Sequence, residues 1–139
     1  MIQISKKEEF IMKLFKTPKG DVVELIYPAG DEVEITINGE PATELKAGTT
    51  DAALEKHVPA VSKDGDKLNV QVGEVKHPML DAHYITDVWV EYPDGTVDKK
   101  SLKPGEEPVA VFDVTGKNGT VNVYEYCNLH GLWKKEFDL

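Results

Sequence analysis

Short runs of β-branched and aromatic residues, separated by turn sequences, recur along the chain and limit the fold more than any other feature. The turns are rich in Pro, Gly, Asn and Asp, which favour tight-turn backbone conformations. Only residues 5–15 are compatible with a short helix. The runs predicted to be strands are residues 22–27, 33–37, 68–72, 84–92, 109–114, 120–126 and 132–137. Many short strands without a long helical period predict an all-β fold, an antiparallel β-sandwich or barrel.

A domain boundary is predicted near residues 45–51, where the sequence is small, polar and without periodicity. It divides the chain into a first part, residues 1–47, and a second part, residues 48–139. The first part is close to the size below which domains need metals, disulfides or a partner chain. Because it contains no Cys or His, we expect it to pack against the second part or another subunit, and we expect a homodimer.

The charge and apolar patterning exclude several classes of partner. A net charge of -9 argues against nucleic-acid binding, which requires Lys and Arg to replace counterions on phosphates. No run approaches the roughly 18 apolar residues of a membrane span. Charged residues at 6–9 interrupt any signal-peptide core, and a single cysteine cannot form an internal disulfide. We therefore expect a cytoplasmic protein that binds neither nucleic acid nor membrane.

The chemistry-bearing side chains are concentrated in the second part. Cysteine and histidine three residues apart lie at the two ends of a short turn, close enough to bind one ion. Two more histidines lie in a loop that leads into a predicted strand. The chain's four histidines and its single cysteine are His57, His77, His83, His130 and Cys127. Together they predict a metal site.

The donor set limits which metal is suitable. Structural zinc takes four ligands, commonly with two or more thiolates, so one cysteine with four histidines is a poor match. A blue-copper site needs an axial Met shortly after its second His, but none follows His130, and Met79 is wrongly placed between two histidines. Four imidazoles and one thiolate suit a five-coordinate iron with its sixth position open.

Three short blocks surround these residues: EKHVP at residues 55–59, HPM with HYI at 77–79 and 83–85, and YCNLHGLWK at 126–134. They closely resemble the iron-binding signatures of the superoxide reductases, the desulfoferrodoxin and neelaredoxin family, and occur in that family's order. The resemblance extends from about residue 47 to the C-terminus. It implies an immunoglobulin-like β-sandwich preceded by a small N-terminal β domain.

The resemblance also implies a metal and an activity. One square-pyramidal iron ion per chain would be held by the four histidines as equatorial ligands and by Cys127 as the axial ligand. In the family, the glutamate matching Glu55 can occupy the sixth position of oxidised iron. The lysine matching Lys56 attracts superoxide and assists the bound peroxide. The implied reaction is the one-electron reduction of superoxide to hydrogen peroxide, followed by re-reduction of the iron.

The first part departs from the longer members of that family. Residues 20–25 and 38–41 resemble the frame of a desulforedoxin-like domain, which binds a second iron through four cysteines in those members. Lys16, Lys19, Ile37 and Asn38 stand here in place of the cysteines. The sequence therefore predicts a domain without its metal, and an external electron donor, which in the family is commonly rubredoxin.

Several side chains beside the ligands have predicted roles. Superoxide is an anion while the chain is acidic, so nearby lysines must attract it. Lys56 is the best candidate, and Lys76 and Lys134 are also adjacent to ligands, although surface lysines are commonly just solvated. Trp133 and Tyr126 are predicted to pack around the Cys–His turn and shield the sulfur.

Two alternative functions remain open from sequence. One is a β-sandwich interaction module whose structural zinc uses Cys127, His130 and two other histidines. The other is a simple electron carrier, which would keep iron but need no open position. Metal analysis and the colour of the oxidised protein separate zinc from iron, because zinc would leave the protein colourless.

Overall fold

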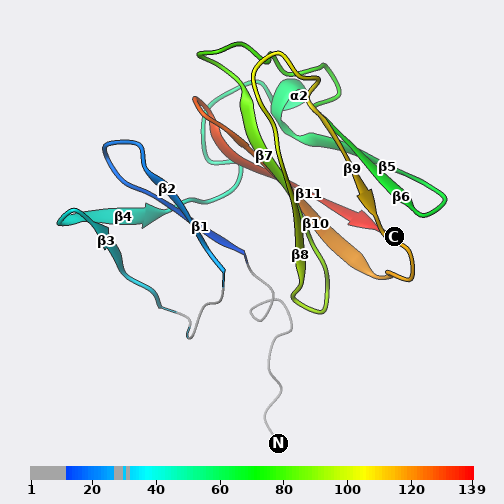
Figure 1. Ribbon diagram of the computed structural model, residues 1–139, viewed down its shortest axis with the longest axis horizontal. Coiled ribbons are helices and arrows are strands. Elements are labelled where there is room, and N and C mark those ends of the chain that lie inside the picture. Colours follow the sequence, from blue (N-terminus) through cyan, green and yellow to red (C-terminus); the bar gives the residue numbers. More distant parts are fainter. Residues whose placement is uncertain (1–11, 27–29, 31) are drawn as a thin grey trace, which may run out of the picture. The chain divides into compact units, whose positions relative to one another are not determined.

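The computed structural model describes residues 12–26, 30 and 32–139, and it divides into two compact units, Met1–Lys46 and Ala47–Leu139. Both are built from antiparallel strands (Figure 1). No helix among the described residues is long and apolar enough to cross a membrane.

The second unit is a sandwich of two antiparallel sheets. The four-stranded sheet has the order β11-β10-β7-β8 and the three-stranded sheet the order β5-β6-β9. The strands of the first sheet are β7 (Ile85–Glu91), β8 (Val97–Ser101), β10 (Thr120–Cys127) and β11 (Gly131–Asp138). Those of the second are β5 (Pro59–Asp64), β6 (Lys67–Val72) and β9 (Val109–Asp113). The predicted all-β sandwich is therefore confirmed.

Side chains from both sheets form one hydrophobic core, following the period of two expected for strands with one buried face. In β10, Val121 and Val123 are fully buried, as the alternation of this strand predicts. Leu68 and Val70 of β6 belong to the same core. Glu125, next on the inward face of β10, is also fully buried, and this burial raises the pKa of its carboxyl well above the ordinary value.

The first unit is a small sheet of four strands in the order β2-β1-β4-β3. Its strands are β1 (Lys13–Lys16), β2 (Val22–Leu25), β3 (Ile35–Ile37) and β4 (Glu40–Glu44). The prediction of a helix over residues 5–15 is wrong at its end, where β1 buries Leu14 and Phe15. The earlier part of that segment, like residue 27 of a predicted strand, lies outside the described residues.

Candidate metal centre

The four histidines and the cysteine lie together at one end of the sandwich. Their ligand atoms are all within 4.8 Å of one another. One histidine ends the single-turn helix α2 (Leu54–His57), two lie between β6 and β7, the cysteine ends β10, and the last histidine precedes β11. The cluster consists of His57, His77, His83, Cys127 and His130. The structure thus brings together every ligand candidate that the sequence offered.

The imidazole rings form a closed square. Each ring contacts its two neighbours edge to face, with centroids 4.6 to 5.0 Å apart and planes at 76° to 84°. The order around the square is His57, His77, His83, His130. Cys127, which is fully buried in the core, places its Sγ 3.4 Å from His77 Nε2 and 3.9 Å from His130 Nδ1. A square of nitrogens with sulfur on the buried side can bind one ion.

Backbone carbonyls fix two of the rings. The Nδ1 of His57 is 2.7 Å from the Ala53 carbonyl oxygen, and the Nδ1 of His77 is 2.7 Å from that of Pro78. In each ring Nδ1 donates its hydrogen, so Nε2 carries the lone pair that can bind a metal. These bonds orient the ligands before any ion binds.

The other two rings differ from each other: His130 directs its Nδ1 to the cluster, and His83 directs its Nε2 there. His130 presents Nδ1, which is 3.1 Å from His57 Nε2. His83 has its Nε2 buried without a hydrogen-bond partner. Buried polar atoms are normally paired, so this nitrogen is the kind of atom that a bound ion would satisfy.

The electrostatics of the metal-free cluster favour uncharged groups. Burial lowers the pKa of His77 to about 4 and also lowers the pKa of His57 and His83, with a further contribution from neighbouring histidines. Burial raises the pKa of the Cys127 thiol, although the backbone N–H groups of Leu129 and His130 oppose this rise. A cation that binds here meets neutral imidazoles and displaces the thiol proton.

Acid should destabilise the metal-free protein. The pKa of His77 is lower in the folded protein than in the unfolded chain, so between pH 6.5 and about 4 the unfolded chain binds more protons. Stability is therefore retained above pH 6.5 and is lost as the pH falls through this window. The urea midpoint of metal-free protein, measured at several pH values, should fall across this range, and less steeply in His77→Gln. A midpoint independent of pH would contradict these lowered pKa values.

The donor set fits a transition-metal ion. Ca²⁺ and Mg²⁺ prefer oxygen ligands, whereas imidazole and thiolate favour zinc, iron and copper. Four-coordinate zinc would leave one of the five grouped donors unused. The arrangement also fits iron held by several imidazoles and one thiolate.

The two charged residues predicted to act at the site precede His57 on α2. Glu55 and Lys56 are both exposed, and no ion-pair partner for Lys56 is found among the described residues. Lys76, in contrast, pairs with Glu107, which offsets its charge. Of these two lysines, Lys56 is therefore better suited to attract an anion.

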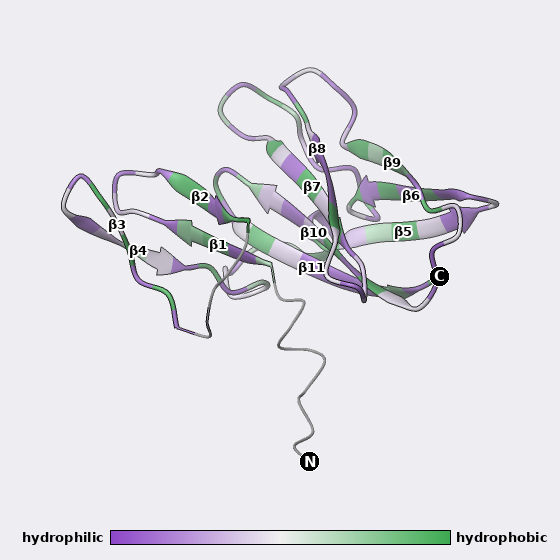
Figure 2. Ribbon diagram, turned by 60° about the horizontal axis from the view of Figure 1, so that its bottom comes forward, coloured by the Kyte–Doolittle hydropathy of each residue, from purple (hydrophilic) through white to green (hydrophobic). Residues whose placement is uncertain are grey.

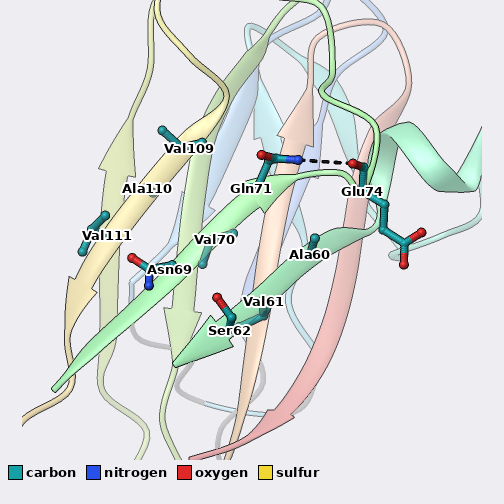
Figure 3. Close-up of a pocket in the computed structure, with 10 residues that line it drawn as sticks. All are labelled: Ala60, Val61, Ser62, Asn69, Val70, Gln71, Glu74, Val109, Ala110 and Val111. Carbon is teal, nitrogen blue, oxygen red and sulfur yellow. Dashed lines mark hydrogen bonds between the residues drawn. The ribbon is translucent and has the colours of Figure 1, made fainter. Parts of the chain in front are cut away.

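The turn after β6 supports α2, a contact that the sequence did not reveal. Val75 N–H donates to the Glu55 carbonyl at 2.9 Å. Gly73 lies so close to α2 that an added Cβ would be 2.7 Å from the carbonyl oxygen of Glu55 and 2.8 Å from the carbonyl carbon of Lys56. Gln71 Nε2 donates to the Gly73 carbonyl at 2.8 Å. It also donates to the Glu74 carbonyl at 3.3 Å (Figure 3). This turn therefore sets the position of the helix that carries His57.

Trp133 contacts two of the candidate ligands. Its Nε1 donates to the His130 carbonyl at 3.0 Å, and its ring centroid lies 5.0 Å from that of His57. The indole is almost fully buried. Its packing beside the Cys–His turn, as predicted, is confirmed.

Known proteins of one family match this chain both in sequence and in fold. The desulfoferrodoxin family model matches residues 49–136. A desulfoferrodoxin homolog of Archaeoglobus fulgidus is 40% identical over 126 residues, covering 89% of this chain and 96% of the relative. The desulfoferrodoxin of Nitratidesulfovibrio vulgaris is 44% identical over 118 residues, covering 84% and 89%. The crystal structure of the superoxide reductase from Treponema pallidum has a TM-score of 0.70 at 34% identity, covering 88% of this chain and 98% of that one.

Proposed function

The chain belongs to the desulfoferrodoxin family of superoxide reductases, and from this we propose that it reduces superoxide to hydrogen peroxide at one iron ion. The observation that carries the proposal is the square of four imidazoles with a buried thiol on one side. We propose that the ring nitrogens of His57, His77, His83 and His130 and the thiolate of Cys127 would hold this ion. The side of the square opposite the sulfur would be left for the substrate.

Ferrous iron at this site would supply one electron to superoxide, which takes up two protons and leaves as hydrogen peroxide. The chain's own contributions are to hold the ion and to attract the anion. The fixed Nδ1 donors of His57 and His77 keep their Nε2 atoms available to the metal. The thiolate of Cys127 adds a negative donor on the buried side, which favours the loss of an electron from the metal.

Local charge must attract the substrate, because the whole chain carries a net charge of -9. Ions screen charges beyond about 8 Å at physiological ionic strength, so the side chains nearest the metal dominate. We propose that Lys56 attracts superoxide and that the Glu55 carboxylate would serve as an additional ligand for the oxidised ion. Both project from the helix that ends in His57.

Lys56→Ala should slow the reaction of the reduced protein with superoxide by about tenfold at low salt, with iron retained. The salt dependence of the rate should also weaken, because the attracting charge is gone. Stopped-flow mixing at several ionic strengths measures both effects. Lys76→Ala is the matched control, since that lysine also adjoins a ligand but is paired with Glu107, and its rate should change less than about twofold. Equal rates for Lys56→Ala and the wild type would refute the role of Lys56.

The reaction itself is tested by its stoichiometry. Chemically reduced protein mixed with superoxide should yield one hydrogen peroxide for each iron oxidised, without release of oxygen. Release of oxygen would indicate dismutation and would contradict the proposal. Elemental analysis of the same sample tests the zinc alternative, because a colourless protein containing only zinc cannot supply the electron.

The electrons must come from outside the chain. Among the described residues, the histidine–cysteine cluster is the only group of such donors able to hold an ion. We propose that the first unit is a desulforedoxin-like domain, over residues 1–47, that has lost its metal. Lys19, at one of the former cysteine positions, instead forms an ion pair with Glu40 at 3.8 Å. A rubredoxin or a similar protein is the proposed donor, and the homodimer and the cytoplasmic location remain predictions.

A further inference from the structure

A single asparagine connects two of the segments that provide metal ligands. Asn128 lies between Cys127 and His130 and is half-buried. Its Oδ1 accepts the N–H of Tyr84 at 2.9 Å, and its Nδ2 donates to the Ala82 carbonyl at 3.0 Å. Its own backbone N–H donates to the Tyr84 carbonyl at 3.2 Å. The bonded residues stand on the two sides of His83.

His83 needs such support more than the other ligands. The rings of His57 and His77 are fixed by hydrogen bonds to carbonyls, and the backbone beside the His130 ring is held by the Trp133 indole. The ring of His83 has no comparable bond among the described residues, and its Nε2 is unpaired. On its own loop it has only a pair of backbone hydrogen bonds with Leu80, at 2.9 and 3.0 Å.

We propose that Asn128 is a positioning residue that holds His83 at the metal centre by binding the backbone on both sides of that histidine. The amide side chain offers one acceptor and one donor, as a neighbouring peptide group would. This allows the loop to be fixed without constraining the imidazole itself. The inference rests on the proposed iron site, and it adds a residue that does not touch the metal or the substrate.

The proposal is tested with Asn128→Ala, which removes both side-chain bonds. Release of ferrous iron to a chelator should become about tenfold faster or more, the range typical when the support of a metal ligand is lost. Asn122→Ala is the matched control, because Asn122, which lies on β10, is also half-buried and donates one side-chain bond, to Glu91 at 3.0 Å. Its iron release should remain close to that of the wild type. Similar release rates for the two variants would overturn the proposal.

A double-mutant cycle shows whether Asn128 acts through His83. If it does, Asn128→Ala should change iron release by less than about twofold in a His83→Ala background. An undiminished effect in that background would overturn the proposal.

A measurement on the metal-free protein is independent of iron. The amide hydrogen of Tyr84 should exchange at least about tenfold faster in Asn128→Ala, because its acceptor is lost, while the amides within β10 should be unaffected. Unchanged exchange at Tyr84 would overturn the proposal even if no variant retained iron. Failure of the wild type to bind iron or to yield peroxide would instead contradict the proposed function.

Discussion

Cys127→Ser is expected to abolish the visible absorption band of the oxidised iron centre. A thiolate bound to ferric iron gives a charge-transfer band, and a serine oxygen is a harder donor that does not give this band. The side chain is fully buried, and its Sγ lies 3.4 Å from His77 Nε2. Serine is close in size to cysteine, so the variant should fold. Absorption spectra of the oxidised and reduced protein, with metal analysis, provide the test.

The other sulfur beside the cluster supplies the control. Met79 lies in the loop between His77 and His83, and its Sδ accepts the N–H of Ile85 at 3.4 Å. Met79→Leu preserves the volume and removes the sulfur, so the visible band should persist in this variant. Survival of the band in Cys127→Ser would reject Cys127 as a ligand. Loss of the band in Met79→Leu but not in Cys127→Ser would show that the band comes from Met79 and not from Cys127.

Gly73→Ala is expected to destabilise the protein by about 3 kcal/mol, at the upper end of the usual cost of overpacking. The added methyl group would lie 2.7 to 2.9 Å from backbone atoms of Glu55, Lys56 and Val58. Backbone atoms cannot rotate away as the end of a side chain can, so α2 must move. Because α2 carries His57, iron content should fall together with stability.

Urea denaturation and the ratio of iron to protein measure these two effects. Gly30→Ala is the control, since its added Cβ meets no atom within 4 Å and its backbone is not in the left-handed region. This control should keep wild-type stability and iron content. Wild-type iron content in Gly73→Ala would show that α2 does not depend on this close approach.

Five of the seven predicted strands belong to the sandwich, and the other two, over residues 22–27 and 33–37, overlap β2 and β3 of the first unit. The sandwich strands that were predicted are rich in valine or aromatic residues: β6, β7, β9 and β10 supply buried side chains to the core, and Phe137 of β11 packs against it. β8 escaped prediction because it is exposed along its whole length and carries Lys99 and Lys100, so no apolar alternation marks it (Figure 2). Its position is set by pairing with β7, which a local pattern cannot show.

Local sequence pattern also fails to predict α2 and β1. The helix α2 has only four residues and no side-chain cap, so it carries no helical signal in the sequence. β1 overlaps the end of the segment over which the sequence predicts a helix, and its adjacent residues Leu14 and Phe15 are both buried. Its pairing with β2 and β4 overrides the weak local preference.

At the metal centre, residue type and spacing suggested the donors, because histidine and cysteine are few in this chain. The supporting residues could not be found in the same way. Gly73 matters through contacts with backbone some 15 to 18 positions earlier, and Asn128 through bonds to residues 82 and 84. Such contacts exist only after the strands have paired.

The ligand-bearing segments leave from both layers of the sandwich, since His57 adjoins β5 and His77 follows β6 whereas Cys127 ends β10. A bound ion would therefore link the two sheets at this end of the sandwich. Taking the ion away would loosen that rim first and leave the remainder closed. The proposed iron centre would thus also stabilise the fold, and oxidation of the Cys127 sulfur would lower the stability of the protein as well as its activity.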